Sequence, residues 1–191
     1  MNKIHDQLTA AADEAARIVA GTHPEQFGDK TPCGQWDVKE LLNHLVLWTS
    51  YSFERRARSE QVGPELQERD FASEPDYAAR YREQLDRALA AWAPDEVWAG
   101  EVDTGHAKMP APQIAEMILM ELVLHAWDLA TATGQEYRCP ADVAATVTKA
   151  VGESAQMYRE YDGFAAEVEL AGDASVFEQA LAVSGRRPVG R

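Results

Sequence analysis

Cysteines and basic residues are scarce in this 191-residue sequence, and each shortage excludes a class of protein. Its 2 cysteines, Cys33 and Cys139, lie far apart and form no CxxC pair, so neither a disulfide framework nor a cysteine-type zinc site is supported. The 18 Lys and Arg residues against 32 Asp and Glu residues leave a net charge of −14. Nucleic-acid backbones and anionic membrane surfaces attract basic proteins, so we expect neither as a partner.

Long apolar runs are missing as well. No segment is long and uncharged enough to span a bilayer, and residues 1–21 are amphipathic, without the continuous apolar core or cleavage site of a signal peptide. The sequence contains no P-loop, dinucleotide fingerprint or GxSxG motif, which argues against NTPase, dehydrogenase and α/β-hydrolase functions. Because the sequence shows neither a membrane-spanning segment nor a signal peptide, we expect a cytoplasmic protein.

Apolar residues recur with helical spacing through most of the chain, and the Ala- and Leu-rich composition favours helix. We expect an all-α fold, a four-helix bundle with small extra helices and a short hairpin. Residues 1–165 would form the bundle domain, and residues 166–191 would form a short C-terminal appendage of the same domain. The expected elements are helices over residues 4–20, 36–59, 75–91, 112–134 and 141–158, a hairpin within 93–111, a strand over 165–170 and a helix over 175–183.

The clearest helix start lies at Asp37. Its carboxylate can cap the free backbone amides, Glu40 completes a capping box, and Trp36 and Leu41 are spaced to form a hydrophobic staple across it. His44 lies on the apolar stripe that begins at Leu41, so we expect this imidazole to point inward with the apolar side chains.

The segment over residues 112–134 is the one around which the rest of the fold is organised. From Met117 to Trp127 it is apolar on every side except at two residues, Glu121 and His125, which are four apart and therefore share one face of the helix. A buried polar group without a partner destabilises a protein by about 1–3 kcal/mol, and a buried charge by more. A metal ion would satisfy both side chains at once.

The proposed ligands are His44, Glu121 and His125, within the bundle domain. Two imidazoles and one carboxylate suit zinc, nickel or ferrous iron, and three protein ligands leave room for water or substrate. Asp128, three residues after His125, could orient an imidazole or replace Glu121 as a ligand. The alternative stays open that these are hydrogen-bonded core residues, because an acidic protein offers Glu-xxx-His pairs by chance.

Two segments carry a family resemblance. Residues 31–45, TPCGQWDVKELLNHL, resemble the TPCxxWxVxxLLxHL signature of mycothiol-dependent maleylpyruvate isomerase-like proteins, which belong to the DinB/YfiT-like superfamily. Residues 121–130, ELVLHAWDLA, resemble the second signature, ExxxHxWDLA. Residues 180–188, ALAVSGRRP, are similar to the GRxP tail of a compact subgroup of the family.

The resemblance implies an up-down-down-up four-helix bundle that holds a divalent metal, usually zinc or nickel, through His44, Glu121 and His125. It also implies a small-molecule thiol of the mycothiol type as cosubstrate, activated at the metal to attack an electrophile, with Asp128 tuning an imidazole. The isomerase itself has a longer C-terminal domain that contributes to its active site. We therefore expect a thiol S-transferase or a related isomerase rather than an enzyme acting on maleylpyruvate.

Two other functions remain open at this stage. One is a metal- or ligand-binding helical module without turnover, and the other is a helical interaction protein whose polar pair is a core hydrogen bond. An exposed apolar helix face would in addition indicate a homodimer.

Overall fold

The computed structural model describes residues 2–34, 36–105 and 107–188, and the chain divides into two compact units, residues 1–137 and residues 138–191. Its elements are α1 (Lys3–Ala20), η1 (Pro24–Gln26), α2 (Val38–Val46), η2 (Leu47–Tyr51), α3 (Ser52–Ala57), α4 (Pro64–Gln67), η3 (Phe71–Ser73), α5 (Tyr77–Ala91), α6 (Asp95–Trp98), β1 (Glu101–Asp103), β2 (Lys108–Pro110), α7 (Ala111–Ala132), α8 (Ala141–Glu160) and α9 (Val176–Val183). Within the described residues, no helix combines the length and the apolar character needed to cross a bilayer.

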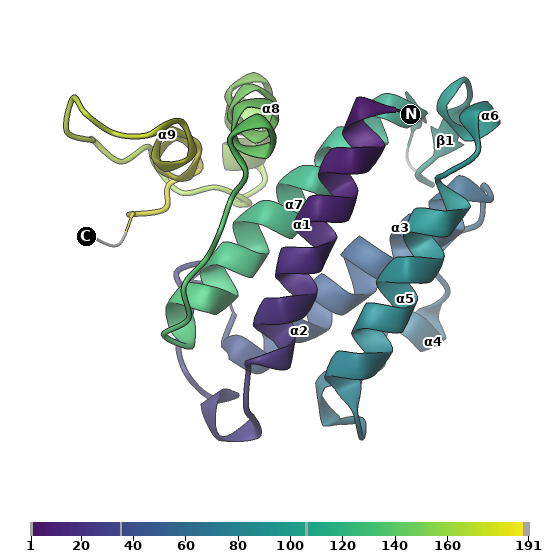
Figure 1. Cartoon of the computed structure of the whole chain (residues 1–191), viewed down its shortest axis with the longest axis horizontal. Helices are drawn as coiled ribbons and strands as arrows, with labels where there is room; N and C mark the ends of the chain where they lie inside the picture. Colours follow the sequence, from purple (N-terminus) through teal and green to yellow (C-terminus); the bar gives the residue numbers. More distant parts are fainter. Residues whose placement is uncertain (1, 35, 106, 189–191) are drawn as a thin grey trace. The chain divides into compact units, whose positions relative to one another are not determined.

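The first unit is an all-α four-helix bundle, which confirms the fold class expected from the sequence. α1 packs against α5 and α7, α2 packs against α7, and α3 packs against α5. α1 and α7 run in one direction, and α5 and the rod formed by α2, η2 and α3 run in the other, as Figure 1 shows. This is the up-down-down-up order. Large apolar side chains from all four rods are almost fully buried between them: Leu8, Ile18, Leu41, Leu45, Phe53, Leu85, Ile114 and Leu119.

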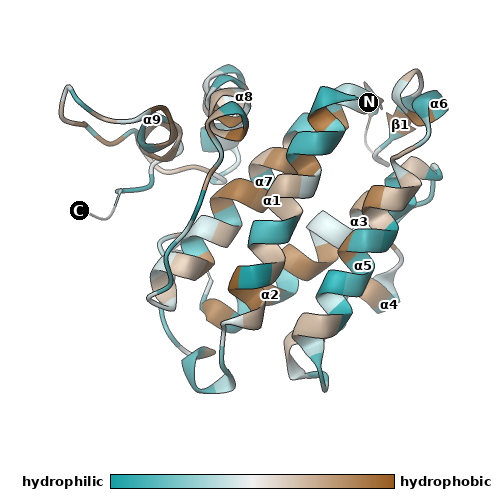
Figure 2. Ribbon diagram, in the orientation of Figure 1, coloured by the Kyte–Doolittle hydropathy of each residue, from teal (hydrophilic) through white to brown (hydrophobic). Residues whose placement is uncertain are grey.

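The helix expected to organise the fold is α7. From Ile118 to Ala130 every residue except Glu121 is buried, and Figure 2 shows hydrophobic colour along much of this helix. Pro112 lies in its first turn, where a missing backbone amide costs nothing, and Gly134, with φ of +69°, closes its C-terminal end. The polar residues of α7 are therefore held on a rigid element that is packed on nearly all sides.

The capping box expected at Asp37 is confirmed. The backbone N–H of Glu40 donates to Asp37 Oδ1 at 2.9 Å, and the N–H of Asp37 donates to Glu40 Oε2 at 3.0 Å. The sequence predicts one uninterrupted helix from here to residue 59, but the structure inserts a π-helical turn, η2, between α2 and α3. Such turns add a residue to the helix and recur at functional sites. This one begins three residues after His44.

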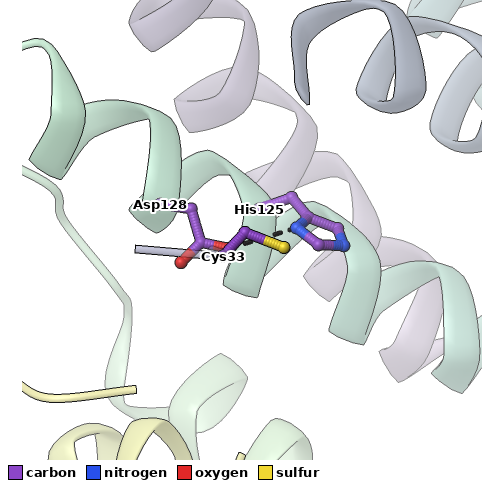
Figure 3. Close-up of side chains that lie close together, drawn as sticks. All are labelled: Cys33, His125 and Asp128. Atoms are coloured by element: carbon purple, nitrogen blue, oxygen red, sulfur yellow. Dashed lines mark hydrogen bonds and ion pairs between the residues drawn. The ribbon is translucent and has the colours of Figure 1, made fainter. Parts of the chain in front are cut away.

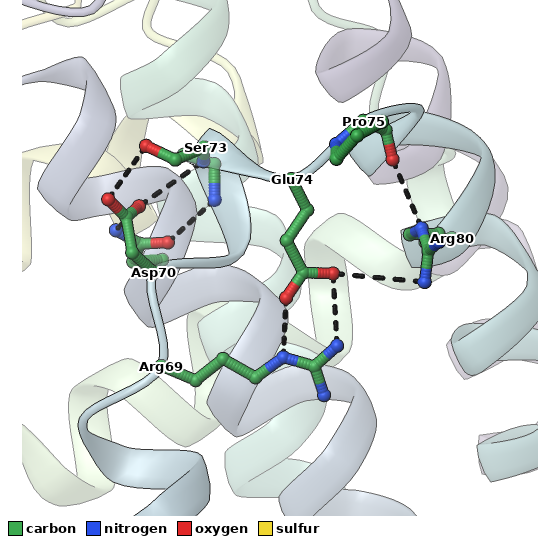
Figure 4. A network of polar contacts seen from close by, with 8 residues as sticks. Arg69, Asp70, Ser73, Glu74, Pro75 and Arg80 are labelled. Carbon is green, nitrogen blue, oxygen red and sulfur yellow. Dashed lines mark hydrogen bonds and ion pairs between the residues drawn. The ribbon is translucent and has the colours of Figure 1, made fainter.

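The segment between α4 and α5 is attached to α2 beside His44. Asn43 Nδ2 donates to Asp70 Oδ1 at 3.1 Å, and its carbonyl oxygen accepts the backbone N–H of Ala72 at 2.9 Å. Figure 4 shows further contacts within the same segment. The Arg69 guanidinium donates two hydrogen bonds to the Glu74 carboxylate, from Nε to Oε1 at 2.5 Å and from Nη2 to Oε2 at 2.9 Å. Asn43 is thereby directed to this segment and away from the polar cluster on α7.

The hairpin expected within residues 93–111 is confirmed as β1 and β2, which pair antiparallel with Val102 opposite Met109. The strand expected over residues 165–170 is not formed. Its Val168 N–H donates to the Ala182 carbonyl at 3.0 Å, so this bond joins the segment to helix α9 and not to a neighbouring strand.

The second unit contains α8 and α9, which pack on each other. Ser175 and Glu178 form a capping box at the start of α9, with bonds of 2.7 and 3.3 Å. The domain boundary expected at residue 165 falls inside this unit, whose first residue is Arg138. The reason is that α8, expected to belong with the bundle, makes its main packing contacts with α9.

Candidate metal centre

The packing of α2 against α7 brings His44 to Glu121, 77 residues later in the chain. His44 Nε2 lies 3.0 Å from Glu121 Oε2, and His125 Nε2 lies 3.2 Å from the same oxygen. The three donor atoms lie within 4.8 Å of one another. Two imidazoles and a carboxylate from two helices therefore converge on one point, as the sequence predicted from their helical positions.

The side chains of His44 and Glu121 are partly accessible, whereas His125 is almost completely buried. The exposed fraction of the side chain is 20% for His44, 22% for Glu121 and 11% for His125. The sequence predicts that all of them point into the apolar core. The structure buries His125 there and leaves His44 and Glu121 at the edge of the core. A small molecule can therefore approach the cluster from outside, as a site with exchangeable ligands requires.

Aromatic rings form the walls of this cluster. The Trp36 ring lies 4.3 Å from the His44 ring and 5.6 Å from the His125 ring, and the Trp48 ring lies 6.4 Å from that of His44, all measured between centroids. Thr31 Oγ1 donates to the Trp36 carbonyl at 2.7 Å, which attaches the preceding turn to the site. The sequence predicts Trp36 as a helix staple, but its ring lies against both histidines.

The electrostatics of the cluster keep Glu121 ionised. Burial acts to raise the pKa of Glu121, but the charges and hydrogen bonds of His125 and His44 hold that pKa well below its usual value. Burial likewise acts to lower the pKa of His125. The charge of Glu121 and hydrogen bonds with Asp128 and Cys33 prevail and raise the pKa of His125 well above its usual value. Without a bound ion, a proton on His125 therefore supplies the positive charge that the carboxylates require.

Asp128 lies at the other nitrogen of the same imidazole. Its Oδ2 is 3.1 Å from His125 Nδ1, and its side chain is fully buried. Glu121 faces Nε2, so Asp128 is positioned to hold the ring and not to take the place of Glu121. A carboxylate on Nδ1 favours the tautomer whose Nε2 lone pair is free for a metal. Of the two roles left open by the sequence, the geometry fits the orienting one.

Residues 8–130 match the family described as mycothiol maleylpyruvate isomerase N-terminal domain. The chain belongs to this family. The matched segment contains the whole polar cluster, from the turn at residue 31 to Asp128, and so agrees with the resemblance that the two sequence signatures carry.

Two uncharacterized proteins from two strains of Mycobacterium tuberculosis, MT0763 and Rv0738, are each 30% identical to the chain over 132 residues. The alignment covers 65% of this chain and 64% of each relative, so the chain spans less than two thirds of the length of these relatives. Because both relatives are uncharacterized, they do not indicate an activity for this chain.

The crystal structure of the mycothiol-dependent maleylpyruvate isomerase and that of its histidine-to-alanine variant resemble this fold. Each has a TM-score of 0.61 and 18% sequence identity, over 78% of this chain and 68% of that chain. At this identity the comparison establishes a shared fold. The chain thus shares its helical bundle fold with the mycothiol-dependent isomerase.

The structure also brings Cys33 to the site, although the sequence, in which Cys33 and Cys139 lie far apart and form no CxxC pair, indicates no cysteine-type zinc site. Cys33 is free and partly buried, and its sulfur lies within 4.8 Å of donor atoms of His125 and Asp128. The signal was present in the sequence: Cys33 and His44 belong to the same signature, TPCxxWxVxxLLxHL. Without the fold, nothing shows that the turn carrying Cys33 lies against α7.

A cavity of about 200 Å³ lies beside Trp48, which follows His44 by four residues in the same helical rod. Ser52 and Arg56 line it from the same helical rod, and Gln61 and Asp103 line it from the segments opposite. Its walls are mostly polar apart from the indole of Trp48. Trp48 therefore lies beside both the His44 ring and this cavity, which is large enough for a small polar group.

Proposed function

We propose that this protein binds one divalent metal ion, zinc or nickel, through His44, Glu121 and His125, and uses it to activate a low-molecular-weight thiol of the mycothiol type. The reaction class is a thiol S-transfer or a thiol-assisted isomerisation of an electrophilic small molecule. The observation that carries the proposal is the convergence of two imidazole nitrogens on one carboxylate oxygen at a partly accessible position. The family described above supports the choice of thiol.

The donor geometry fits such an ion. In a tetrahedral zinc site with ligands at about 2.1 Å, neighbouring donor atoms lie about 3.4 Å apart. Glu121 Oε2 is 3.0 Å from His44 Nε2 and 3.2 Å from His125 Nε2, so small side-chain rotations are enough to admit the ion. The ionised Glu121 supplies one of the two negative charges that a divalent cation attracts. The accessible side of the cluster leaves a position for the thiol.

When bound, the metal supplies a Lewis acid that favours the thiolate form of the cosubstrate near neutral pH. The residues of the chain do the rest. Asp128 keeps the proton of His125 on Nδ1, and the rings of Trp36 and Trp48 exclude water from the imidazoles. The remaining part of the thiol would lie in the cavity beside Trp48, where Arg56 and Gln61 offer hydrogen bonds. Such binding would hold the sulfur at the site while an electrophile approaches from outside.

The first test is the metal content of protein purified without an affinity tag or chelator. We expect about one zinc or nickel per chain in the wild-type protein, and loss of the metal in His44→Ala and in His125→Ala, because each variant lacks one of three ligands. His23→Ala, which removes an exposed histidine, is the control and should keep its metal. Full metal content in both ligand variants would refute the proposed donor set.

The second test concerns the thiol. The protein is loaded with cobalt(II), and its absorption is recorded before and after addition of N-acetylcysteine. A sulfur-to-cobalt charge-transfer band that appears with the thiol, and that is absent in His44→Ala, supports the proposal. A spectrum that stays unchanged at saturating thiol would reject thiol activation and leave a metal-binding module without turnover.

A second candidate function rests on the same contacts. Glu121 Oε2 already accepts from two imidazoles, and such a cluster can serve as a polar contact between α2 and α7 without any ion. That function predicts no metal even after reconstitution, and a thermal unfolding temperature that a chelator does not change. The proposed metal centre predicts the opposite in both measurements, because an ion bound only by the folded chain stabilises it.

A further inference from the structure

His125 takes part in two groups of metal-binding side chains. The first, with His44 and Glu121, is the proposed centre at its Nε2 atom. The second consists of Cys33, His125 and Asp128, whose donor atoms also lie within 4.8 Å of one another. Figure 3 shows the sulfur of Cys33 and the carboxylate of Asp128 beside the same edge of the imidazole ring. A thiol, an imidazole and a carboxylate form a donor set of their own.

Hydrogen bonds in the local fold hold the side chains of the second group in place. Cys33 lies in a turn in which the Gly34 N–H donates to the Thr31 carbonyl at 3.1 Å, with Gly34 at φ of +72°. The turn is attached through the hydrogen bond of Thr31 to Trp36, and Lys30 pairs with Asp37 next to it. Asp128 is fixed on α7 and fully buried. Two of the three donors therefore lie on one rigid helix, and the third lies on an anchored turn.

The two groups differ in chemical preference. The first offers nitrogen and oxygen donors alone, whereas the second includes a sulfur. Thiolate sulfur prefers soft, thiophilic ions, and imidazole and carboxylate accept a wider range of metals. An ion such as cadmium therefore gains more from Cys33 than magnesium or manganese would.

One imidazole cannot serve both groups in its neutral form, because it has a single nitrogen lone pair. An ion at Nε2 requires the proton on Nδ1, where it donates to Asp128. An ion at Nδ1 requires the proton on Nε2, where it donates to Glu121. The position of one proton on His125 thus decides which group is complete.

We propose that Cys33, His125 and Asp128 form a second metal position, selective for divalent ions softer than zinc, such as cadmium, that excludes simultaneous occupation of the centre at His44. The second position itself does not depend on the proposed thiol chemistry, whereas the exclusion rests on the proposed centre. A soft ion such as cadmium would bind here and remove His125 from the first centre, so that one chain holds one ion at a time.

The experiment is a cadmium titration of the full-length protein, followed by the ultraviolet absorption of the cadmium–thiolate bond and by metal analysis. We expect the absorption in the wild-type protein and in His44→Ala, which disables only the first centre. Cys33→Ser should lose the absorption, and Cys139→Ser, the matched control at the other cysteine, should keep it. Retention of zinc by Cys33→Ser would show that this variant is folded and that the first centre does not need the sulfur.

The outcomes separate the two sites. Absence of cadmium–thiolate absorption in His44→Ala, or its persistence in Cys33→Ser, would overturn the second position. Two cadmium ions bound per chain at once in the wild-type protein would overturn the exclusion. Loss of zinc in His44→Ala together with retained cadmium–thiolate absorption supports both positions. Failure of zinc to bind the wild-type protein, with cadmium–thiolate absorption intact, would reject the proposed centre and leave the second position standing.

Discussion

Replacement of Asp128 by Asn tests whether a carboxylate behind His125 matters for metal binding. The substitution keeps the shape of a side chain that is fully buried, 3.1 Å from His125 Nδ1, and removes its charge. Loss of such a partner behind a metal-bound imidazole typically weakens binding 10- to 100-fold, which corresponds to about 1.4–2.8 kcal/mol. We expect the upper end of this range, because an amide can turn its NH₂ group toward Nδ1. The proton of His125 would then favour Nε2, where it competes with the metal and weakens zinc binding.

The assay is competition for zinc between the protein and a chromophoric chelator at a fixed pH. Glu116→Gln is the matched control, because it removes a partly exposed carboxylate from the same helix, α7, without touching the cluster. Circular dichroism checks that both variants retain the helical fold. The wild-type protein and Glu116→Gln should compete equally, and Asp128→Asn should release zinc at a lower chelator concentration.

Two results would contradict the reasoning. Zinc binding by Asp128→Asn as tight as in the wild-type protein would show that the tautomer of His125 is not controlled by Asp128. Complete loss of zinc, equal to that of His125→Ala, would show that Asp128 is itself a ligand. The side chain would then have to leave Nδ1 and reach the ion directly.

Three further predictions concern stability. Asp37→Ala removes the capping box of α2 and should lower the free energy of unfolding by about 1 kcal/mol, seen as a lower urea midpoint with an unchanged slope. Tyr81→Phe leaves the Thr49 hydroxyl without its 2.8 Å partner inside the core and should lower that free energy by a similar amount, about 1 kcal/mol; an unchanged midpoint would contradict the bond. The hydrogen bond of Lys39 lowers the pKa of Asp70 from 3.8 to about 2; burial opposes this shift, and Ser73 and Asn43 add to it. The contribution of Asp70 to the free energy of unfolding should therefore be complete above pH 4 and decline as the pH falls toward 2. Because the Asp70 side chain is 44% exposed, we expect about 1 kcal/mol after solvent screening, absent in Asp70→Asn when both proteins are titrated with acid.

Much of the bundle could be predicted from the sequence because its signals are local. The capping box at Asp37 and the apolar stripe after it define the start of α2. The unbroken apolar character of α7 defines a helix with neighbours on every side. Glu121 and His125 share a face of that helix through their spacing alone, so two of the three proposed ligands follow from one segment.

The features that the sequence did not predict depend on contacts between residues far apart in the sequence or on the register of backbone hydrogen bonds. The π-turn at Leu47–Tyr51 depends on the hydrogen-bond register of a single turn, which the spacing of apolar residues in so short a segment does not define. The positions of Cys33 and Trp36 depend on how the turn before α2 lies against α7. The packing of α8 on α9 depends on which element its apolar face covers, and the spacing of apolar residues within α8 does not reveal that.

Stability alone gives no reason for the polar cluster. Two carboxylates on α7 flank one imidazole, Glu121 at Nε2 and Asp128 at Nδ1, and a second imidazole, that of His44, shares Glu121. Burying such groups involves a desolvation penalty that often exceeds the attraction between them, and apolar replacements of similar volume are commonly neutral or stabilising. The surrounding side chains, among them Leu122 and Leu124, show that apolar residues fit this part of α7. With a proton on His125, one positive charge lies between the two carboxylates inside the fold. With a divalent ion in place of that proton, the same atoms gain a bond that no apolar core provides, which is the physical reason to favour a metal centre over a structural contact.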